Sequence, residues 1–320
     1  MKSLKTKPIS GQCIMPVNEK RLTFSAPAKI NLFFELLGKR DDGFHEIETV
    51  MSAVSIYDHL EFQITSSPEI CLEMVEEVTG IPTDERNLIV KAIHRVRQVA
   101  VEEGSGSLPG IRVRLVKQIP AAAGMGGASS DAASAIMAAN ELWGLKWSLR
   151  KQSELASTIG SDVPFFLCSH LAICTGRGEK IEPIAADFRL PVVIARPPVG
   201  LSTADVYAKC VVPDSPRSSG ELVKAFSLGR IDKIGGLIFN RLETFAGELS
   251  EWTERLRYEF DRTNCTGHQL TGSGSCYFGI YPNRKVAINA SRCLSNRLPD
   301  VTILSGETLN CGGDQFSDRN

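Results

Sequence analysis

The sequence lacks the features that mark several large classes of protein. Its 36 basic and 37 acidic residues nearly cancel, which leaves no positive excess of the kind that binds nucleic acid. No apolar run approaches the length of a membrane-spanning helix. Residues 1–20 include Lys2, Lys5 and Lys7 but no apolar stretch of the kind found in secretory signals. We expect no nucleic-acid or membrane partner, and a cytoplasmic protein for which a plastid location stays open.

Two further absences concern disulfides and metals. The nine cysteines are odd in number and never occur as C-x-x-C, and the five histidines never occur as H-x-x-H. Disulfide frameworks use even sets of cysteines, and structural zinc sites use such close spacings. We therefore expect reduced cysteines and no metal ligands among the side chains.

A segment made almost only of Gly, Ala and Ser is the most informative feature that is present. This segment, IPAAAGMGGASSD at residues 119–131 (the glycine loop), precedes a helical pattern over residues 132–143. Small residues let backbone N–H groups approach an anion closely, and the helix dipole favours negative charge there. Ser129, Ser130 and Asp131 are expected to cap this helix, and Gly144 to end it. The segment predicts a phosphate-binding loop, with a flexible linker as the alternative for this composition.

The glycine loop does not match the two best-known phosphate-binding signatures. No lysine lies between Lys117 and Lys146, which excludes the Gly-Lys-Ser/Thr ending of a P-loop. The dinucleotide-binding pattern is excluded because Ser129 stands where its third glycine would be. Residues 111–116 alternate apolar side chains with two arginines, which is typical of a strand with one solvated face. A doubly wound parallel sheet would have a continuous apolar run there, and we therefore expect a mixed or antiparallel sheet.

The remaining pattern predicts an α+β chain in two lobes. The expected divisions are a flexible N-terminal extension (1–20), a first lobe (21–175), a second lobe (176–309) and a polar tail (310–320). In the first lobe we expect strands at 21–25, 30–37, 45–56, 59–64 and 111–116, a turn at 39–43, and helices at 86–103, 132–143 and 149–159. The first lobe ends with a strand expected at 171–175, and beyond it we expect strands at 191–195, 276–281 and 301–304, and helices at 203–210, 243–261 and 285–297. A second small-residue segment, TGSGS at residues 271–275 (the TGSGS turn), precedes one of these strands.

Two charged residues stand out in apolar surroundings. Lys29 lies among small and apolar residues, where a lysine is more often a surface residue that buries only its aliphatic stem. Asp162 follows a helix stop at Gly160, and on spacing alone it is an N-cap for a turn over residues 163–167. Neither residue establishes a catalytic site when taken alone.

Five motifs in order give these residues a context. They are PAKINL at 27–32, GKRDDGFH at 38–45, residues 120–130, GSDVP at 160–164 and LTGSGSCYF at 270–278. Together they resemble the GHMP kinase superfamily and, within it, the 4-diphosphocytidyl-2-C-methyl-D-erythritol kinases, over residues 22–304. The resemblance implies a two-lobed fold with ATP and substrate bound in the cleft between the lobes. It also implies Mg²⁺- and ATP-dependent phosphorylation of the 2-hydroxyl of 4-diphosphocytidyl-2-C-methyl-D-erythritol, giving the 2-phosphate and ADP, in the non-mevalonate isoprenoid pathway.

The resemblance also implies roles for individual residues. Asp162 would be the general base, and Lys29 would orient it and balance charge on the transferring phosphoryl group. The substrate-binding residues implied are Asn31, Phe44, His45, Asp162, Thr203, Tyr207, Gly272 and Ser273. Phe44 and His45 would clamp the cytosine, with Tyr207 on its other face. The ATP-binding residues implied are Asn87, Pro120, Ala121, Ala122, Ala123, Gly124, Met125, Gly126, Gly127, Ala128, Ser129 and Ser130.

Two departures from the family pattern concern these residues. Phe44 stands where many members have Tyr, which keeps a ring for stacking but loses a hydroxyl. The glycine loop has alanines at 121–123, and alanine avoids positive φ, but the glycines nearest the phosphates are present and activity is expected. The alternatives are another GHMP-type kinase or decarboxylase, or a non-catalytic sensor of the same fold, which would be expected to lack Lys29 or Asp162. The expected assembly is a monomer or a weak homodimer.

Overall fold

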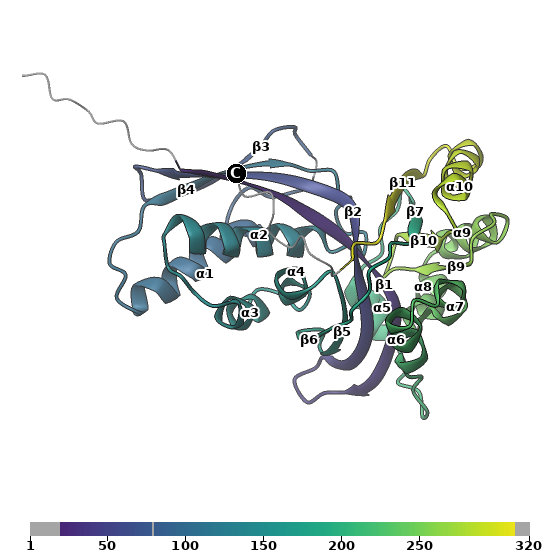
Figure 1. The fold of residues 1–320 in the computed structure, drawn as a ribbon. Helices are drawn as coiled ribbons and strands as arrows, with labels where there is room; N and C mark the ends of the chain where they lie inside the picture. The colour runs from purple at the N-terminus through teal and green to yellow at the C-terminus, as the bar shows by residue number, and fades with distance from the viewer. Residues whose placement is uncertain (1–19, 79, 311–320) are drawn as a thin grey trace, which may run out of the picture.

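The computed structural model describes residues 20–78 and 80–310. Nearly all of the expected N-terminal extension and polar tail therefore lies outside the described residues. The described chain forms two lobes, each built on its own sheet (Figure 1), which confirms the predicted two-lobed α+β architecture. Within the described ranges, no helix is both long enough and apolar enough to cross a membrane.

The first sheet has seven strands in the order β3-β4-β2-β1-β8, with β5 paired to β2 and β6 paired to β5. The strands are β1 (Arg21–Lys39), β2 (His45–Thr65), β3 (Ile70–Met74), β4 (Gly110–Val116), β5 (Leu171–Gly176), β6 (Lys180–Pro183) and β8 (Phe239–Asn240). Strand β4 is antiparallel to β2 and parallel to β3, which confirms the expected mixed sheet.

Strands β1 and β2 are longer than predicted. Each joins two segments that the sequence divides, and together they form one antiparallel hairpin around the expected turn. Register shifts at Pro27/Ala28 and Asn31/Phe33 let the pair bend without ending. Residues 28–36 of β1 are buried throughout, because this part of the strand runs between the two lobes (Figure 1).

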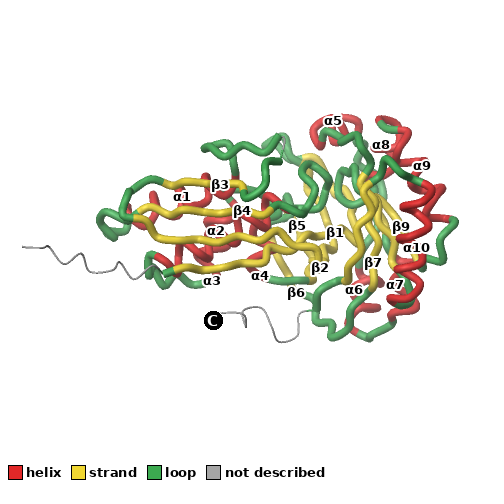
Figure 2. The backbone as a smooth tube through the Cα atoms, turned by 90° about the horizontal axis from the view of Figure 1, so that it is seen from above, coloured by secondary structure: helices red, strands yellow, loops and turns green. Residues whose placement is uncertain are grey.

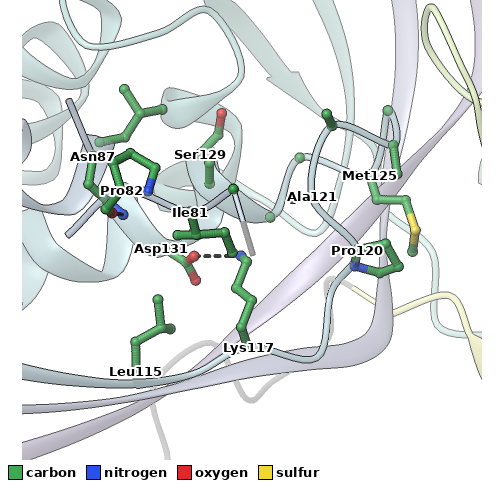
Figure 3. Close-up of a pocket in the computed structure, with 18 of the residues that line it drawn as sticks. Ile81, Pro82, Asn87, Leu115, Lys117, Pro120, Ala121, Met125, Ser129 and Asp131 are labelled. Carbon is green, nitrogen blue, oxygen red and sulfur yellow. Dashed lines mark hydrogen bonds and ion pairs between the residues drawn. The ribbon is translucent and has the colours of Figure 1, made fainter. Parts of the chain in front are cut away.

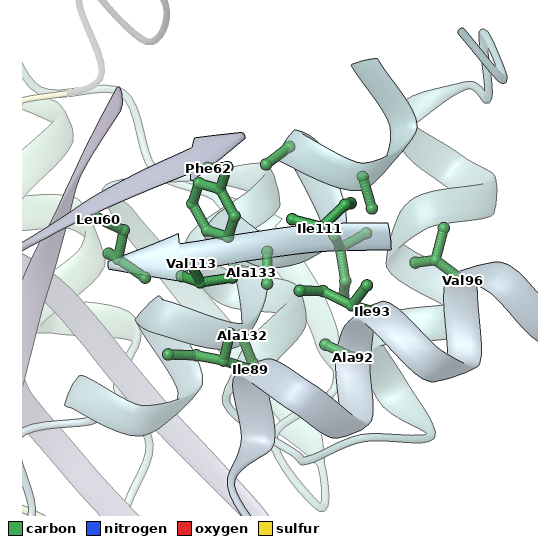
Figure 4. Packing of buried hydrophobic residues seen from close by; sticks show 14 of the residues in the cluster. Leu60, Phe62, Ile89, Ala92, Ile93, Val96, Ile111, Val113, Ala132 and Ala133 are labelled. Carbon is green, nitrogen blue, oxygen red and sulfur yellow. The ribbon is translucent and has the colours of Figure 1, made fainter. Parts of the chain in front are cut away.

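Four helices cover one face of the first sheet (Figure 2). They are α1 (Leu88–Glu102), α2 (Gly127–Leu142), α3 (Leu149–Ser157) and α4 (Val163–Cys168). The apolar residues of β4 point inward onto α1 and α2, while Arg112 and Arg114 are exposed. Figure 4 shows this layer, in which Ile111 and Val113 pack with Ile93 and Ala132. Burial of such side chains is the main contribution to the stability of this lobe.

The second lobe is built on a four-stranded antiparallel sheet in the order β11-β7-β10-β9. Its strands are β7 (Pro191–Arg196), β9 (Gly267–Leu270), β10 (Tyr277–Ile280) and β11 (Thr302–Glu307). Its helices are α5 (Thr203–Lys209), α6 (Gly220–Ser227), α7 (Ile231–Leu237), α8 (Leu242–Leu249), α9 (Glu251–Asp261) and α10 (Arg284–Arg297). The single helix expected over residues 243–261 is wrong, because Ser250 is extended (φ −149°) and its side chain caps α9.

The two lobes share strands and backbone contacts. Strand β6 belongs to the first sheet and β7 to the second. The chain therefore passes from one sheet to the other between β6 and β7, after the division expected at residue 175. Strand β8 comes from the second half of the chain but pairs in parallel with β1. The glycine loop meets the TGSGS turn at this junction, where the N–H of Cys276 donates to the carbonyl of Ala123 at 3.3 Å.

Candidate active site

The glycine loop leads directly into α2. The helix begins at Gly127 rather than at residue 132, so Ser129, Ser130 and Asp131 lie within it, and the prediction that they cap it is wrong. Gly126 is the N-cap, with a φ of 70° that favours glycine and turns the chain into the helix early. Ala122 also has a positive φ, of 51°, despite the preference of alanine.

A cavity of about 400 Å³ opens over this loop (Figure 3). Of the twelve residues predicted to bind ATP, all except Ser130 line the cavity. Asn87 enters the cavity wall as the N-cap of α1, where its side chain accepts from the N–H of Ile89. The first N–H groups of α2 have no partners within the helix, and they give this cavity an anion-binding end.

Lys29 and Asp162 lie together beside the glycine loop. Lys29 Nζ is 3.4 Å from Asp162 Oδ2 and donates to Asn31 Oδ1 at 2.8 Å. The side chain of Lys29 is 5% exposed, so this lysine is not a surface residue with a buried stem. Asp162 begins α4, but its side chain makes no capping hydrogen bond. The surface interpretation of Lys29 is therefore wrong, whereas Asp162 occupies the N-cap position that its spacing predicts but leaves its carboxylate free to face Lys29.

The TGSGS turn closes the other side of this charged pair. Asn31 N–H donates to Thr271 Oγ1 at 3.1 Å, across the junction of the lobes. A Cβ added to Gly272 would lie 3.5 Å from Lys29 Nζ, and one added to Gly124 would lie 2.3 Å from the Thr271 carbonyl oxygen. The backbones of the two glycine segments thus approach each other more closely than a side chain at Gly124 would allow, and the TGSGS turn lies in contact distance of the lysine.

The residues expected to clamp a cytosine form a second group. Tyr207 packs on His45, with ring centres 5.3 Å apart, and Phe44 is 51% exposed. Burial, with a smaller effect of Lys39, lowers the pKa of His45 and favours a neutral imidazole. Thr203 lies one turn before Tyr207 on α5, and its hydroxyl is 2.8 Å from that of Ser273. Helix α5 therefore links the aromatic group to the TGSGS turn.

Sequence reasoning missed a charged cluster in the cavity wall. Lys117 Nζ lies 2.5 Å from Asp58 Oδ2 and 2.7 Å from Asp131 Oδ2, and all three side chains are buried. The N–H groups of Gln118 and Ile119 donate to the other oxygen of Asp58, which stabilises its negative charge. A signal was present, because the inward alternation of residues 111, 113 and 115 places residue 117 on the buried face.

Asn240 is a second residue that the sequence did not reveal. Its buried side-chain amide donates to the carbonyls of Leu270 and Gly272, both at 2.8 Å. Its Oδ1 accepts from the N–H of Leu242 at 2.9 Å. The amide nitrogen therefore holds the start of the TGSGS turn, while the amide oxygen ties it to the start of α8.

The acidic, histidine and cysteine side chains of the described chain are not clustered as a metal-ligand set. No group of three or more His, Cys, Asp or Glu residues is placed there to hold an ion. The hydroxyl of Ser130 is buried without a hydrogen-bond partner, so it retains the capacity to bind a group that enters with a nucleotide.

Comparison with known proteins agrees with this arrangement. A family model for the GHMP kinases N terminal domain matches residues 87–170, and one for the GHMP kinases C terminal domain matches residues 222–300. The crystal structure of a homoserine kinase from Cytophaga hutchinsonii has a TM-score of 0.72 at 16% identity, covering 93% of this chain and 98% of that one. Fold and matched domains together define a GHMP kinase.

Relatives with higher sequence identity assign the chain to one family among the GHMP kinases. A 4-diphosphocytidyl-2-C-methyl-D-erythritol kinase from Rhodopirellula baltica is 37% identical over 314 residues, covering 88% of this chain and 93% of that protein. The crystal structure of a 4-(cytidine 5'-diphospho)-2C-methyl-D-erythritol kinase has a TM-score of 0.74 at 30% identity, covering 91% of this chain and all of that one. The chain belongs to the family of 4-diphosphocytidyl-2-C-methyl-D-erythritol kinases.

Proposed function

We propose that this protein transfers the γ-phosphoryl group of ATP to the 2-hydroxyl of 4-diphosphocytidyl-2-C-methyl-D-erythritol, releasing ADP, in the non-mevalonate isoprenoid pathway. The observation that carries the proposal is the buried Lys29, 3.4 Å from Asp162 and next to the glycine loop. A phosphoryl transfer needs a base, a positive charge and a phosphate cradle at one place, and this arrangement supplies all three.

In this proposal Asp162 accepts the proton of the attacking hydroxyl. The hydroxyl oxygen forms a bond to the γ-phosphorus while the bond to the β–γ bridging oxygen breaks, and ADP leaves. Lys29 balances the negative charge on the phosphoryl oxygens and holds the carboxylate in place. A positioned carboxylate of this kind contributes about 10²–10⁴-fold to the rate.

The cavity over the glycine loop would bind ATP. The first N–H groups of α2 face its phosphates, and Asn87 lies at the adenine end of the wall. A Mg²⁺ ion bound with the nucleotide would supply neutralisation of the charge on its phosphates. The unpartnered hydroxyl of Ser130 fits a role toward that ion or a phosphate oxygen.

The alcohol substrate would be bound on the other side of Lys29. Asn31, with Gly272 and Ser273 of the TGSGS turn, contacts the polyol. Phe44 and Tyr207 stack on the cytosine, and His45 forms a hydrogen bond to it. In the structure Tyr207 packs on His45 with ring centres 5.3 Å apart, which places the ring proposed to stack beside the imidazole proposed to form the hydrogen bond.

A substrate panel tests this function. ADP release is measured with Mg-ATP and, separately, the cytidyl substrate, methylerythritol phosphate, mevalonate and homoserine. The proposal expects turnover of the cytidyl substrate alone. Turnover of another alcohol would reassign the substrate while keeping the kinase fold, and ATP binding without any turnover would support a sensor.

A further inference from the structure

The turn that joins β5 to β6 places an arginine against the aromatic clamp. The guanidinium carbon of Arg177 lies 5.0 Å from the ring centre of Phe44. This is within the distance at which a cation is attracted to the face of an aromatic ring. The side chain of Arg177 is 30% exposed and Phe44 is 51% exposed, so both remain accessible to a ligand.

The same turn also lies beside the catalytic pair. Its two glycines, Gly176 and Gly178, have φ values of 76° and 116°, which fold it tightly. A Cβ added to Gly178 would lie 3.8 Å from Asp162 Oδ1. One short turn thus lies beside the proposed base at Gly178 and contacts the proposed clamp through its arginine.

Acidic residues near Arg177 hold its backbone but neutralise the charge of its guanidinium only in part. Its N–H donates to Glu179 Oε2 at 2.6 Å, whereas its Nε is 4.0 Å from that oxygen, the outer limit of an ion pair. Although desolvation raises the pKa of Asp42, the hydrogen bond from the Phe44 N–H, the ion pair with Arg40 and, least, the charge of Arg177 lower it. The guanidinium therefore keeps donors for a further anion.

The proposed substrate has an anionic group at the corresponding place. It joins a cytosine, which would stack on Phe44, to a polyol, which would react at Asp162, through a diphosphate. Because the turn that carries Arg177 lies beside Asp162 at Gly178 and beside Phe44 at its guanidinium, its charge would lie near the route that the diphosphate follows. Arginine matches phosphate oxygens with paired N–H donors.

We propose that Arg177 is a specificity-determining residue for the nucleotide-linked alcohol. One face of its guanidinium supports the Phe44 ring, and its outward N–H groups bind the substrate diphosphate. The support replaces the anchoring that a tyrosine hydroxyl would give at position 44. This inference rests on the proposed function for its substrate, but its test does not depend on turnover.

Binding of cytidine and of CDP, measured by calorimetry, separates the two contributions. In Arg177→Met we expect the cytidine affinity to fall about two- to fivefold, because the ring loses its support. The CDP affinity should fall by about a further tenfold or more, because charge-assisted hydrogen bonds to phosphate are lost. Arg177→Lys keeps the charge and should recover part of the CDP affinity only.

Two controls keep the result specific. Lys180→Met removes the positive charge of an exposed residue at the start of β6, to which no part in substrate binding is assigned. This variant should leave both affinities unchanged. ATP affinity and thermal stability should be unchanged in Arg177→Met, which would show an intact fold. Equal CDP affinity in the wild type and Arg177→Met would overturn the inference, as would an equal loss for cytidine and CDP. Absence of turnover by the wild type would instead overturn the proposed function.

Discussion

The N–H of Lys29 donates to the carbonyl of Met125 at 2.9 Å. This bond joins the strand that bears the proposed charge-balancing lysine to the loop that would hold the phosphates. A Cβ added to Gly126 would lie 2.9 Å from Lys29 Cγ, so the lysine side chain runs along the same loop. The position of the glycine loop relative to Lys29 is therefore fixed by the main chain, which would suit a reaction that depends on positioning.

Replacing the proposed base should reduce turnover without reducing nucleotide binding. We expect Asp162→Asn to lower kcat by about 10²–10⁴-fold, because the amide cannot accept the hydroxyl proton. The affinity for ATP, measured by calorimetry, should be unchanged. Asp187→Asn removes an exposed carboxylate elsewhere and serves as the matched control. A kcat for Asp162→Asn close to that of the wild type would show that another group is the base.

The clamp should depend on the ring of Tyr207 and not on its hydroxyl. Burial raises the pKa of Tyr207, so the hydroxyl stays protonated and neutral. Stacking on a base is worth roughly 1–3 kcal/mol, and Tyr207→Ala should raise KM for the cytidyl substrate by about tenfold or more. Tyr207→Phe is the control and should keep KM within about twofold of the wild type. If the two variants have the same KM, Tyr207 does not stack on the substrate.

The free energy of unfolding should depend on the amide group of Asn240. In Asn240→Asp a carboxylate would face the two carbonyl oxygens that now accept from Nδ2, and we expect the free energy of unfolding to fall by at least about 2 kcal/mol. Urea denaturation measures this change. Asn283→Asp makes the same substitution at the exposed N-cap of α10, where Asp is favourable. Equal stability of the two variants would show that the amide does not hold the TGSGS turn.

The cluster around Lys117 should make stability depend on pH. Burial, with a contribution from Asp58 and despite the attraction of Lys117, raises the pKa of Asp131 from 3.8 to about 7. In this range the folded state holds a proton that the unfolded state releases, so stability falls as pH rises from about 4 to about 7. Asp131→Asn cannot titrate there, and it should become more stable relative to the wild type as pH rises. Urea denaturation at pH 5 and pH 8 measures the difference, and a constant difference would contradict this assignment.

Local signals in the sequence predicted much of the fold. The Ser148 cap of α3 is confirmed, because its side chain accepts from the N–H of Lys151. Gly144, with a φ of 64°, follows α2 as expected. Long-range pairing was not predictable in this way: the two-residue strand β8 forms only because β1 lies beside it. The start of α2 was misplaced because N-cap preference favours Ser129, whereas the left-handed Gly126 begins the helix earlier.

The residues of the candidate site were likewise predictable only in part. Residues within the motifs, such as Lys29 and Asp162, could be named in advance, and the structure brings them together. Lys117, Asn240 and Arg177 act through partners that are distant in sequence, and composition gives no indication of those contacts. Such residues are found only when the fold shows what they touch.

The most direct test of the account is ³¹P NMR of the purified protein with Mg-ATP and 4-diphosphocytidyl-2-C-methyl-D-erythritol. The account predicts a new phosphomonoester signal that grows as the γ-phosphate signal of ATP declines and ADP appears, while the diphosphate of the substrate stays intact. It further predicts no such signal with mevalonate or homoserine. Stable ATP signals in the presence of the cytidyl substrate, or transfer only to another alcohol, would contradict the central claim.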